Sequence, residues 1–142
     1  MVEASVSELM GSPSQGSSFV FVLCLIDMKY KGGCHCGKTL YEVETNLESI
    51  IRCNCSHCQI KGLLLTFVPK SDFTLLTDES SESVYHFNKH KIDHLFCSTC
   101  GVQSYAKGKD KEGNETRAIN VRCLEGIDFE NLKLTTVDGK SW

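Results

Sequence analysis

The cysteines carry most of the chemical information in this sequence. Nine cysteines occur in 142 residues, and seven of them fall into three tight clusters. The clusters are Cys34-His35-Cys36, Cys53-Asn54-Cys55-Ser56-His57-Cys58 and Cys97-Ser98-Thr99-Cys100. A structural zinc ion usually takes four protein ligands, whereas a zinc ion that takes part in chemistry keeps one position open. Seven thiols divide as four plus three, which predicts one closed and one open zinc site.

Spacing along the chain predicts which thiols share a metal. Cys53, Cys55 and Cys58 lie within six residues, so one local turn can direct all three at a single ion. The two outer clusters each supply a pair, and two such pairs complete a tetrahedron, as in zinc ribbons. We therefore expect a structural zinc at Cys34, Cys36, Cys97 and Cys100. The triplet would hold a second zinc with an open position. Spacing alone also permits a different partition.

Disulfide bonds, an iron–sulfur cluster and simple burial are the alternatives for these cysteines. Nine is an odd number, and a bridge within a Cys-x-Cys pair is strained. An iron–sulfur cluster also uses four thiolates, but the Cys-x-Cys spacing and the four-plus-three division favour zinc. Cys24 and Cys123 lie in apolar runs without a partner at ligand spacing. We interpret these two as small buried hydrophobic residues.

Composition limits the class of protein. A chain of 142 residues is long enough for one domain with a real hydrophobic core. Its net charge of −3 lacks the basic excess typical of nucleic-acid binding, which argues against a nucleic-acid partner. Lys107, Lys109 and Lys111 are interleaved with acidic residues and glycine, a pattern typical of a solvated loop.

The first 27 residues differ from the rest. Residues 1–18 are rich in Ser and Gly, which is typical of a flexible tail, and the apolar run 19–26 follows. This run is shorter than the roughly twenty apolar residues of a membrane span, and no Lys or Arg precedes it as in a signal peptide. We expect a cytoplasmic protein in a reducing compartment, with the nucleus as an alternative and no membrane partner. The working domain is predicted at 28–142, after an extension over 1–27.

Short strands are predicted for most of the remaining chain. Alternating or β-rich runs between turn residues indicate strands at 38–43, 63–69, 73–76, 84–87, 94–96, 103–106 and 118–122. Turns are expected at Gly32-Gly33, Lys61-Gly62 and Lys107-Gly108, among others. Short helical turns are expected near 56–60 and 129–132. Many short strands without βαβ alternation predict a mainly β, antiparallel domain.

Three spaced motifs together resemble one known family. They are Gly33-Cys34-His35-Cys36-Gly37, Cys53-Asn54-Cys55-Ser56-His57-Cys58 and His94-Leu95-Phe96-Cys97-Ser98-Thr99-Cys100-Gly101. In this order they resemble the glutathione-dependent formaldehyde-activating enzyme family, whose domain also occurs in centromere protein V. The resemblance runs from about residue 31 to Trp142. It implies an Mss4-like fold of several small antiparallel sheets. It also implies two zinc ions: a structural one at Cys34, Cys36, Cys97 and Cys100, and a catalytic one at Cys53, Cys55 and Cys58.

Charge counting indicates what an open three-thiolate zinc would do. Its net charge is −1, so it is a weaker Lewis acid than a three-histidine zinc, and hydrolysis is not the natural reaction. It can accept a fourth sulfur, and a substrate thiol bound there stays nucleophilic. The resemblance implies that glutathione attacks formaldehyde to give S-(hydroxymethyl)glutathione. The reverse reaction breaks a carbon–sulfur bond, so the class is carbon–sulfur lyase. Another small thiol or thiol–aldehyde adduct is an alternative substrate.

Two other functional classes stay open. One is a zinc-stabilised interaction module like the domain of centromere protein V, but residues 1–27 hold no Lys or Arg for a basic binding extension. The other is a purely structural protein, which needs a fourth ligand at the triplet such as His57 or Cys123. His57 could also relay a proton, although we prefer a turn residue at a helix start. His94 is interpreted as packed or on the surface rather than catalytic, and Gln103 and Ser104 as candidate contacts for a peptide ligand.

Overall fold

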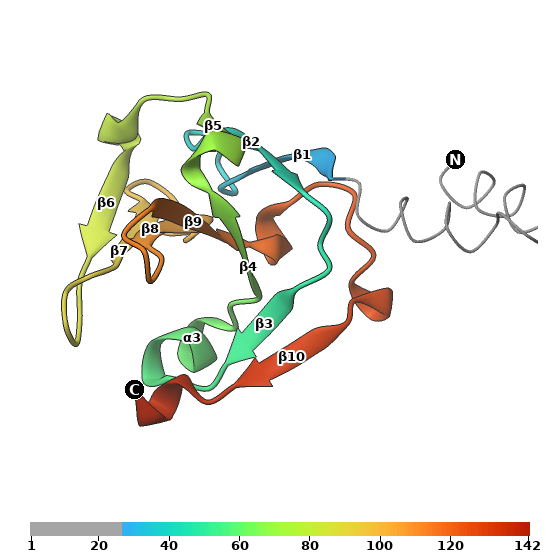
Figure 1. The fold of residues 1–142 in the computed structure, drawn as a ribbon. Coiled ribbons are helices and arrows are strands. Elements are labelled where there is room, and N and C mark those ends of the chain that lie inside the picture. The colour runs from blue at the N-terminus through green and yellow to red at the C-terminus, as the bar shows by residue number, and fades with distance from the viewer. Residues whose placement is uncertain (1–26) are drawn as a thin grey trace, which may run out of the picture.

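The computed structural model describes residues 27–142, in which two β-sheets make up most of the fold (Figure 1). The smaller sheet has the order β1-β2-β5, with β1 at Met28–Gly33, β2 at Leu40–Thr45 and β5 at Phe73–Leu75. The larger sheet has the order β10-β3-β4-β9-β8-β7-β6. Its strands are β3 (Ile50–Cys53), β4 (Leu65–Pro69), β6 (Glu82–Tyr85), β7 (Asp93–Cys97), β8 (Tyr105–Lys109), β9 (Glu115–Asn120) and β10 (Leu134–Val137).

Helical structure is short within the described residues. The one α-helix, α3, spans Ser56–Lys61. The 3₁₀ turns are η1 (Lys70–Asp72), η2 (Glu79–Ser81), η3 (Val121–Cys123), η4 (Phe129–Asn131) and η5 (Gly139–Ser141). None of the helices in residues 27–142 has the length and hydropathy of a membrane span. The prediction of a mainly β domain with short helical turns near 56–60 and 129–132 is confirmed.

The strands pair antiparallel with one exception. Strand β10 runs parallel to β3, and this pairing sets Val137 beside Cys53. Every other neighbouring pair in the two sheets is antiparallel. The larger sheet curves, with the β6–β7 hairpin at one end and β3, α3 and the C-terminus at the other (Figure 1). The parallel edge pair brings the end of the chain to the end of β3.

Alternating side chains give the larger sheet two different faces. One face carries a cross-strand row of buried residues: Thr66, Ile119, Tyr105 and Leu95. This row packs against Tyr41 of the smaller sheet, whose ring centroid lies 5.7 Å from that of Tyr105. The Tyr41 hydroxyl donates a hydrogen bond to the Ser104 carbonyl at 3.1 Å, so its polar end is satisfied. Each large apolar side chain buried here contributes about 1.5–3 kcal/mol, and the opposite face is left for the site.

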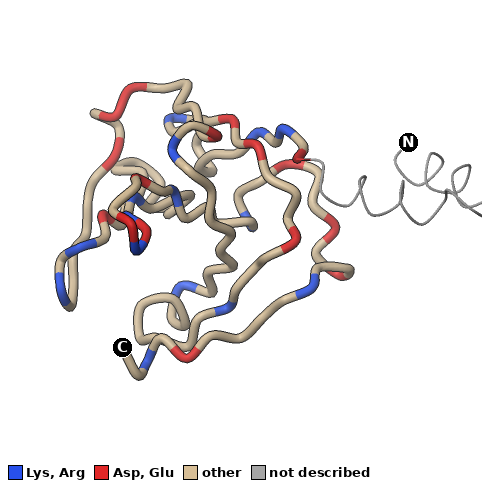
Figure 2. Tube along the Cα trace, viewed as in Figure 1, with Lys and Arg blue, Asp and Glu red and all other residues tan. Residues whose placement is uncertain are grey.

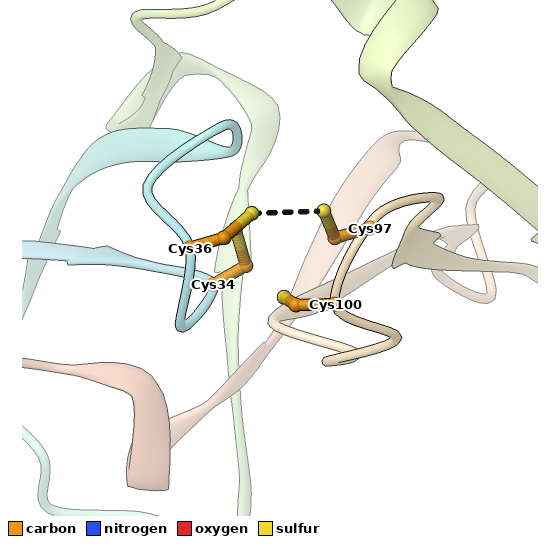
Figure 3. A group of neighbouring side chains, drawn as sticks. All are labelled: Cys34, Cys36, Cys97 and Cys100. Carbon is orange, nitrogen blue, oxygen red and sulfur yellow. Dashed lines mark hydrogen bonds between the residues drawn. The ribbon is translucent and has the colours of Figure 1, made fainter.

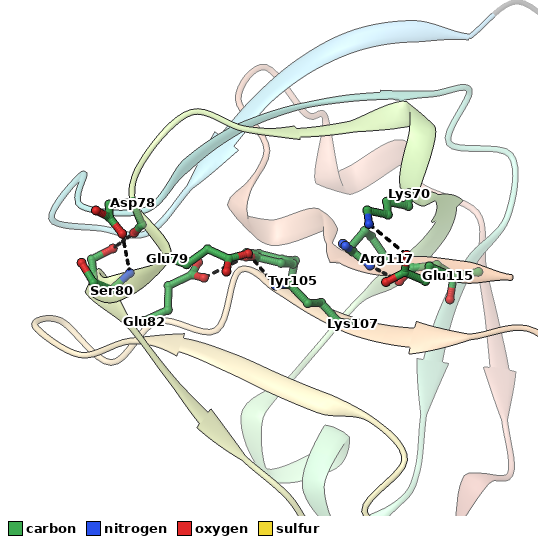
Figure 4. A network of polar contacts seen from close by, with 11 residues as sticks. Lys70, Asp78, Glu79, Ser80, Glu82, Tyr105, Lys107, Glu115 and Arg117 are labelled. Carbon is green, nitrogen blue, oxygen red and sulfur yellow. Dashed lines mark hydrogen bonds and ion pairs between the residues drawn. The ribbon is translucent and has the colours of Figure 1, made fainter. Parts of the chain in front are cut away.

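A network of polar contacts supports η2 and the outer strands (Figure 4). The Tyr105 hydroxyl donates to Glu82 at 2.8 Å, and Lys107 pairs with Glu79 at 2.7 Å. Burial raises the pKa of Glu82. Lys107 and Lys109 both lie in strand β8, so the prediction of a solvated loop is wrong for these two residues. Lys111 lies in the turn that follows β8.

Three strands were not predicted from the sequence. They are β1, β3 and β10, and two expected turns lie inside strands instead: Gly32-Gly33 in β1 and Lys107-Gly108 in β8. At Gly32 the Tyr41 ring occupies the place of a side chain, within 2.8 Å of where a β-carbon would lie. Close approach rather than a turn thus explains that glycine. The predicted extension over 1–27 lies outside the described residues, apart from residue 27.

Candidate metal centres and the adjoining cleft

The first cysteine cluster joins two loops that are far apart in the sequence. Cys34 and Cys36 lie between β1 and β2, whereas Cys97 ends β7 and Cys100 lies in the turn after it. The four sulfur atoms lie within 4.8 Å of one another. The Cys36 sulfur is 3.6 Å from the sulfurs of Cys34 and Cys97. Figure 3 shows the four side chains gathered from the two loops around one centre.

These sulfur positions fit a zinc ion. Four zinc–sulfur bonds of about 2.3 Å in a tetrahedron place the sulfurs about 3.8 Å apart, close to the 3.6 Å observed. A disulfide would need about 2.05 Å. Backbone amides also donate to the thiols, from Thr39 to Cys34 at 3.3 Å and from Thr99 to Cys97 at 3.4 Å. A backbone hydrogen bond from Val102 helps to lower the pKa of Cys100 to about 6, which favours the thiolate that a metal needs.

The second cluster is built at the junction of β3 and α3. Cys53 ends β3, Cys55 caps the helix, and Cys58 lies in its first turn. Cys55 is extended (φ −61°, ψ 158°), and its sulfur accepts the Cys58 backbone amide at 3.3 Å, the role that Ser or Asp usually plays at a helix N-terminus. Gly62 ends the helix in the left-handed conformation, with φ 64°. The three sulfurs lie within 4.8 Å of one another.

The environment of the triplet suits a cation. Burial, and then the Cys55 and Cys53 thiols, raise the pKa of Cys58 well above its ordinary value. Burial would also raise the pKa of Cys55, but the backbone amide and thiol of Cys58 bring it below the ordinary value. Three thiolates so close together repel one another, and a divalent cation supplies the missing positive charge. Both cysteine groups could therefore hold zinc.

The fourth position of the triplet is not filled by either residue considered from the sequence. Within residues 27–142, no further His, Cys, Asp or Glu lies close enough to all three sulfurs to join the group. The His57 ring turns to His94 and Phe87, at centroid distances of 4.3 and 5.0 Å. Cys123 is half-buried, and its sulfur lies 4.0 Å from the Gln103 carbonyl. The purely structural interpretation thus lacks the ligand that it needs.

A polar cluster links α3 to β7 and to the segment before β8. Lys61 donates to the Gln103 side chain at 2.8 Å, and the Gln103 amide lies 3.5 Å from the His94 ring. Both ring nitrogens of the buried His57 lack a hydrogen-bond partner among the described residues. Burial, followed by the charges of His57 and Lys61, lowers the pKa of His94 to about 4. His94 is therefore packed, which is one of the two positions expected for it, and its low pKa keeps it neutral near pH 7. Gln103 is already engaged by protein groups.

The triplet lies at the wall of a cleft of about 900 Å³ on the second face of the larger sheet. Cross-strand pairing aligns Phe67, Ala118, Ala106 and His94 in one row across β4, β9, β8 and β7. All four line the cleft. The two alanines leave a hollow between larger side chains. This row was not predicted, because it depends on strand register.

Comparison with known proteins agrees with these features. The family model of the glutathione-dependent formaldehyde-activating enzyme matches residues 29–135. The matched range includes all seven clustered cysteines. A crystal structure of a Rhodobacter sphaeroides protein is similar, with a TM-score of 0.66 and 29% sequence identity. That match covers 78% of this chain and 100% of the other.

Proposed function

This chain belongs to the glutathione-dependent formaldehyde-activating enzyme family, and from that premise we propose that it is a zinc-dependent carbon–sulfur lyase. Its substrate would be a glutathione–aldehyde adduct of the type of S-(hydroxymethyl)glutathione. One observation carries the proposal: the thiols of Cys53, Cys55 and Cys58 converge at a cleft, and no fourth protein ligand joins them in the described chain.

The two cysteine groups would have different roles. Cys34, Cys36, Cys97 and Cys100 would hold a structural zinc that ties the β1–β2 turn to the end of β7. The triplet would hold the catalytic zinc. When bound there, zinc offers an open position for sulfur and lowers the pKa of a substrate thiol.

The residues around the triplet restrict how a substrate approaches. Cys53 and Cys58 are buried and Cys55 is half-buried, so a substrate reaches the sulfurs from the cleft. Lys89, Lys91 and Lys140 line that cleft and would attract the two carboxylates of glutathione. Holding the thiol and the aldehyde in one site contributes proximity. The neutral His94 and the engaged Gln103 provide fixed polar walls rather than charge.

The reaction conserves atoms and electrons without a redox partner. The thiolate electron pair forms the carbon–sulfur bond to the aldehyde carbon. The carbonyl π pair moves to oxygen, which takes up one proton. In the lyase direction the hydroxyl loses that proton and the carbon–sulfur bond breaks. Formaldehyde and thiols also combine without a catalyst, so any test must measure a rate above this background.

Zinc content and exchange rate together test the proposal. Elemental analysis should find about two zinc ions per wild-type chain and about one in Cys55→Ser, with glutathione protecting the more labile ion. Exchange NMR at equilibrium should show faster interconversion of formaldehyde and S-(hydroxymethyl)glutathione with the wild type than with the variant. One firmly held zinc regardless of glutathione, with equal exchange rates, would overturn the proposal in favour of an interaction module. The cytoplasmic location stays a prediction, which cell fractionation can test.

A further inference from the structure

The cleft beside the triplet is much larger than one-carbon chemistry requires. Its volume of about 900 Å³ is at the upper end of the range that accommodates drug-sized ligands. Formaldehyde contributes a single carbon, and the glutathione backbone is polar. The floor of the cleft is instead formed by apolar side chains, which favour an apolar group of a ligand.

Strand register explains the apolar floor. Phe67, Ala118 and Ala106 are direct cross-strand neighbours, and Leu65 and Ile51 form the next pair toward the triplet. All five side chains line the cleft. A continuous apolar track thus leads from the thiols along the larger sheet, with its hollow at the two alanines.

Large apolar side chains are exposed around this track. Phe67 is 55% exposed, Ile92 is 46% exposed and Trp142 is 76% exposed, and all three line the cleft. Exposed apolar side chains gathered around one hollow mark a binding site more often than scattered ones do. An apolar ligand in the hollow would remove part of this surface from water.

The charged side chains that line the cleft are all basic. They are Lys89, Lys91 and Lys140, and no Asp or Glu within residues 27–142 lines it. These three lysines form no ion pair with the described residues. Figure 2 shows basic residues at the tip of the β6–β7 hairpin and beside the C-terminus. The cleft therefore combines an apolar floor with a cationic rim, which matches an anionic ligand that carries an apolar group.

We propose that the aldehyde half of the adduct is a medium-chain aliphatic or an aromatic aldehyde, whose apolar group lies on the Phe67–Ala118–Ala106 track. This inference rests on the proposed lyase function. The glutathione carboxylates lie at the lysine rim, the sulfur lies at the triplet, and the apolar group lies between them. The bond changes are those given above, with an alkyl or aryl group in place of one formaldehyde hydrogen.

Thioether analogues of the adduct test the inference on the full chain. Trp142 is the only tryptophan and lines the cleft, so its fluorescence reports binding. S-hexylglutathione should bind at least tenfold more tightly than S-methylglutathione, because burial of each additional methylene favours binding. Calorimetry should give the same ratio without relying on Trp142. The protein should likewise catalyse formation of the glutathione adduct with a higher kcat/KM for hexanal than for formaldehyde, after the uncatalysed rate is subtracted.

A substitution in the hollow supplies the decisive comparison. Ala118→Phe fills the space between Phe67 and Ala106, and should reduce S-hexylglutathione binding to the level of S-methylglutathione while zinc content stays unchanged. Thr74→Phe introduces the same side chain at an exposed position of β5, in the other sheet, and should keep the preference. If Thr74→Phe keeps the preference for S-hexylglutathione, the loss of that preference in Ala118→Phe is specific to the hollow.

The outcomes separate this inference from the proposed function. Equal affinity for the two analogues, or a hexyl preference that survives Ala118→Phe, overturns the inference. If formaldehyde exchange is still catalysed in that case, the lyase function stands with a one-carbon substrate. If neither analogue binds and no aldehyde exchange is catalysed, both proposals fail.

Discussion

Gly139 lies directly against the sulfur of Cys53, and a β-carbon at position 139 would collide with that sulfur. The contact exists because β10 runs parallel to β3 and carries the chain back to the triplet. Asn54 then holds the returning segment, since its side chain donates to Asp138 at 2.9 Å and accepts the Lys140 amide at 3.0 Å. The C-terminal residues thus form one wall of the cysteine triplet.

Gly139→Ala should remove the metal of the triplet and spare the other one. The added methyl group must displace Cys53 or push η5 away, and overpacking of this kind typically costs about 1–3 kcal/mol. The zinc content measured by elemental analysis should therefore fall from about two ions per chain to about one. Gly108→Ala is the matched control, because the nearest atoms to its new β-carbon are 3.8 and 3.9 Å away. Two zinc ions in Gly139→Ala would contradict this account of the wall.

Cys97→Ser should destabilise the fold far more than Cys55→Ser does. Cys97 is buried, and its sulfur lies with those of Cys34, Cys36 and Cys100 between the β1–β2 turn and the end of β7. Loss of a zinc held there would free these two segments from each other. Loss of a structural metal is one of the few mechanisms that lower stability by more than about 4 kcal/mol, and we expect a loss of this size in Cys97→Ser. Urea unfolding followed by circular dichroism measures both variants. Equal losses would show that the two sites contribute alike to folding.

Local spacing explains why the two groups of converging cysteines could be predicted from the sequence. Each cysteine cluster is short, and its residue types and spacing indicate a possible zinc site without any knowledge of the fold. The contact of Gly139 with Cys53 was not predictable in this way, because it depends on the parallel pairing of β10 with β3, and neither strand was expected. A glycine near the chain end carries no signal of what it packs against.

The row of residues along the cleft was also not predictable from local spacing. Ala106 and Ala118 are unremarkable in the sequence, and only the register of β8 and β9 makes them neighbours. The strands themselves were largely visible from β-rich runs and turn residues. Strand β1 was missed because Gly32-Gly33 has turn composition, whereas the Tyr41 ring packs where a side chain on Gly32 would lie. Pairing between distant segments is decided by tertiary packing.

Stability should fall in mild acid through His94. Burial, and then His57 and Lys61, lower its pKa to about 4, whereas an unfolded chain titrates near the ordinary value of about 6.5. The unfolded state therefore binds more protons between these values, so the contribution is complete above about pH 6.5 and is lost as pH falls toward 4. The loss should reach about 2–3 kcal/mol.

His94→Gln separates this effect from acid release of zinc. Thiolates are protonated in acid in both proteins, so the metal contribution cancels in the comparison. Urea unfolding at pH 7.5 and pH 5 should show a steeper loss of the free energy of unfolding for the wild type than for the variant. Parallel pH profiles would mean that His94 is protonated at the same pH in the folded and unfolded chain.

Neutralising the lysine rim should weaken glutathione binding and its dependence on salt. Replacing Lys89, Lys91 and Lys140 together by Gln removes the charges that line the cleft, and each exposed charge contributes about 0.2–1 kcal/mol. We expect an affinity about three- to 150-fold lower and a flatter salt dependence, measured by calorimetry from low to physiological salt. The control replaces Lys109, Lys111 and Lys133, which are exposed and do not line the cleft. It changes net charge equally, so an equal loss of affinity in both variants would assign the effect to overall charge and contradict a specific role for the rim.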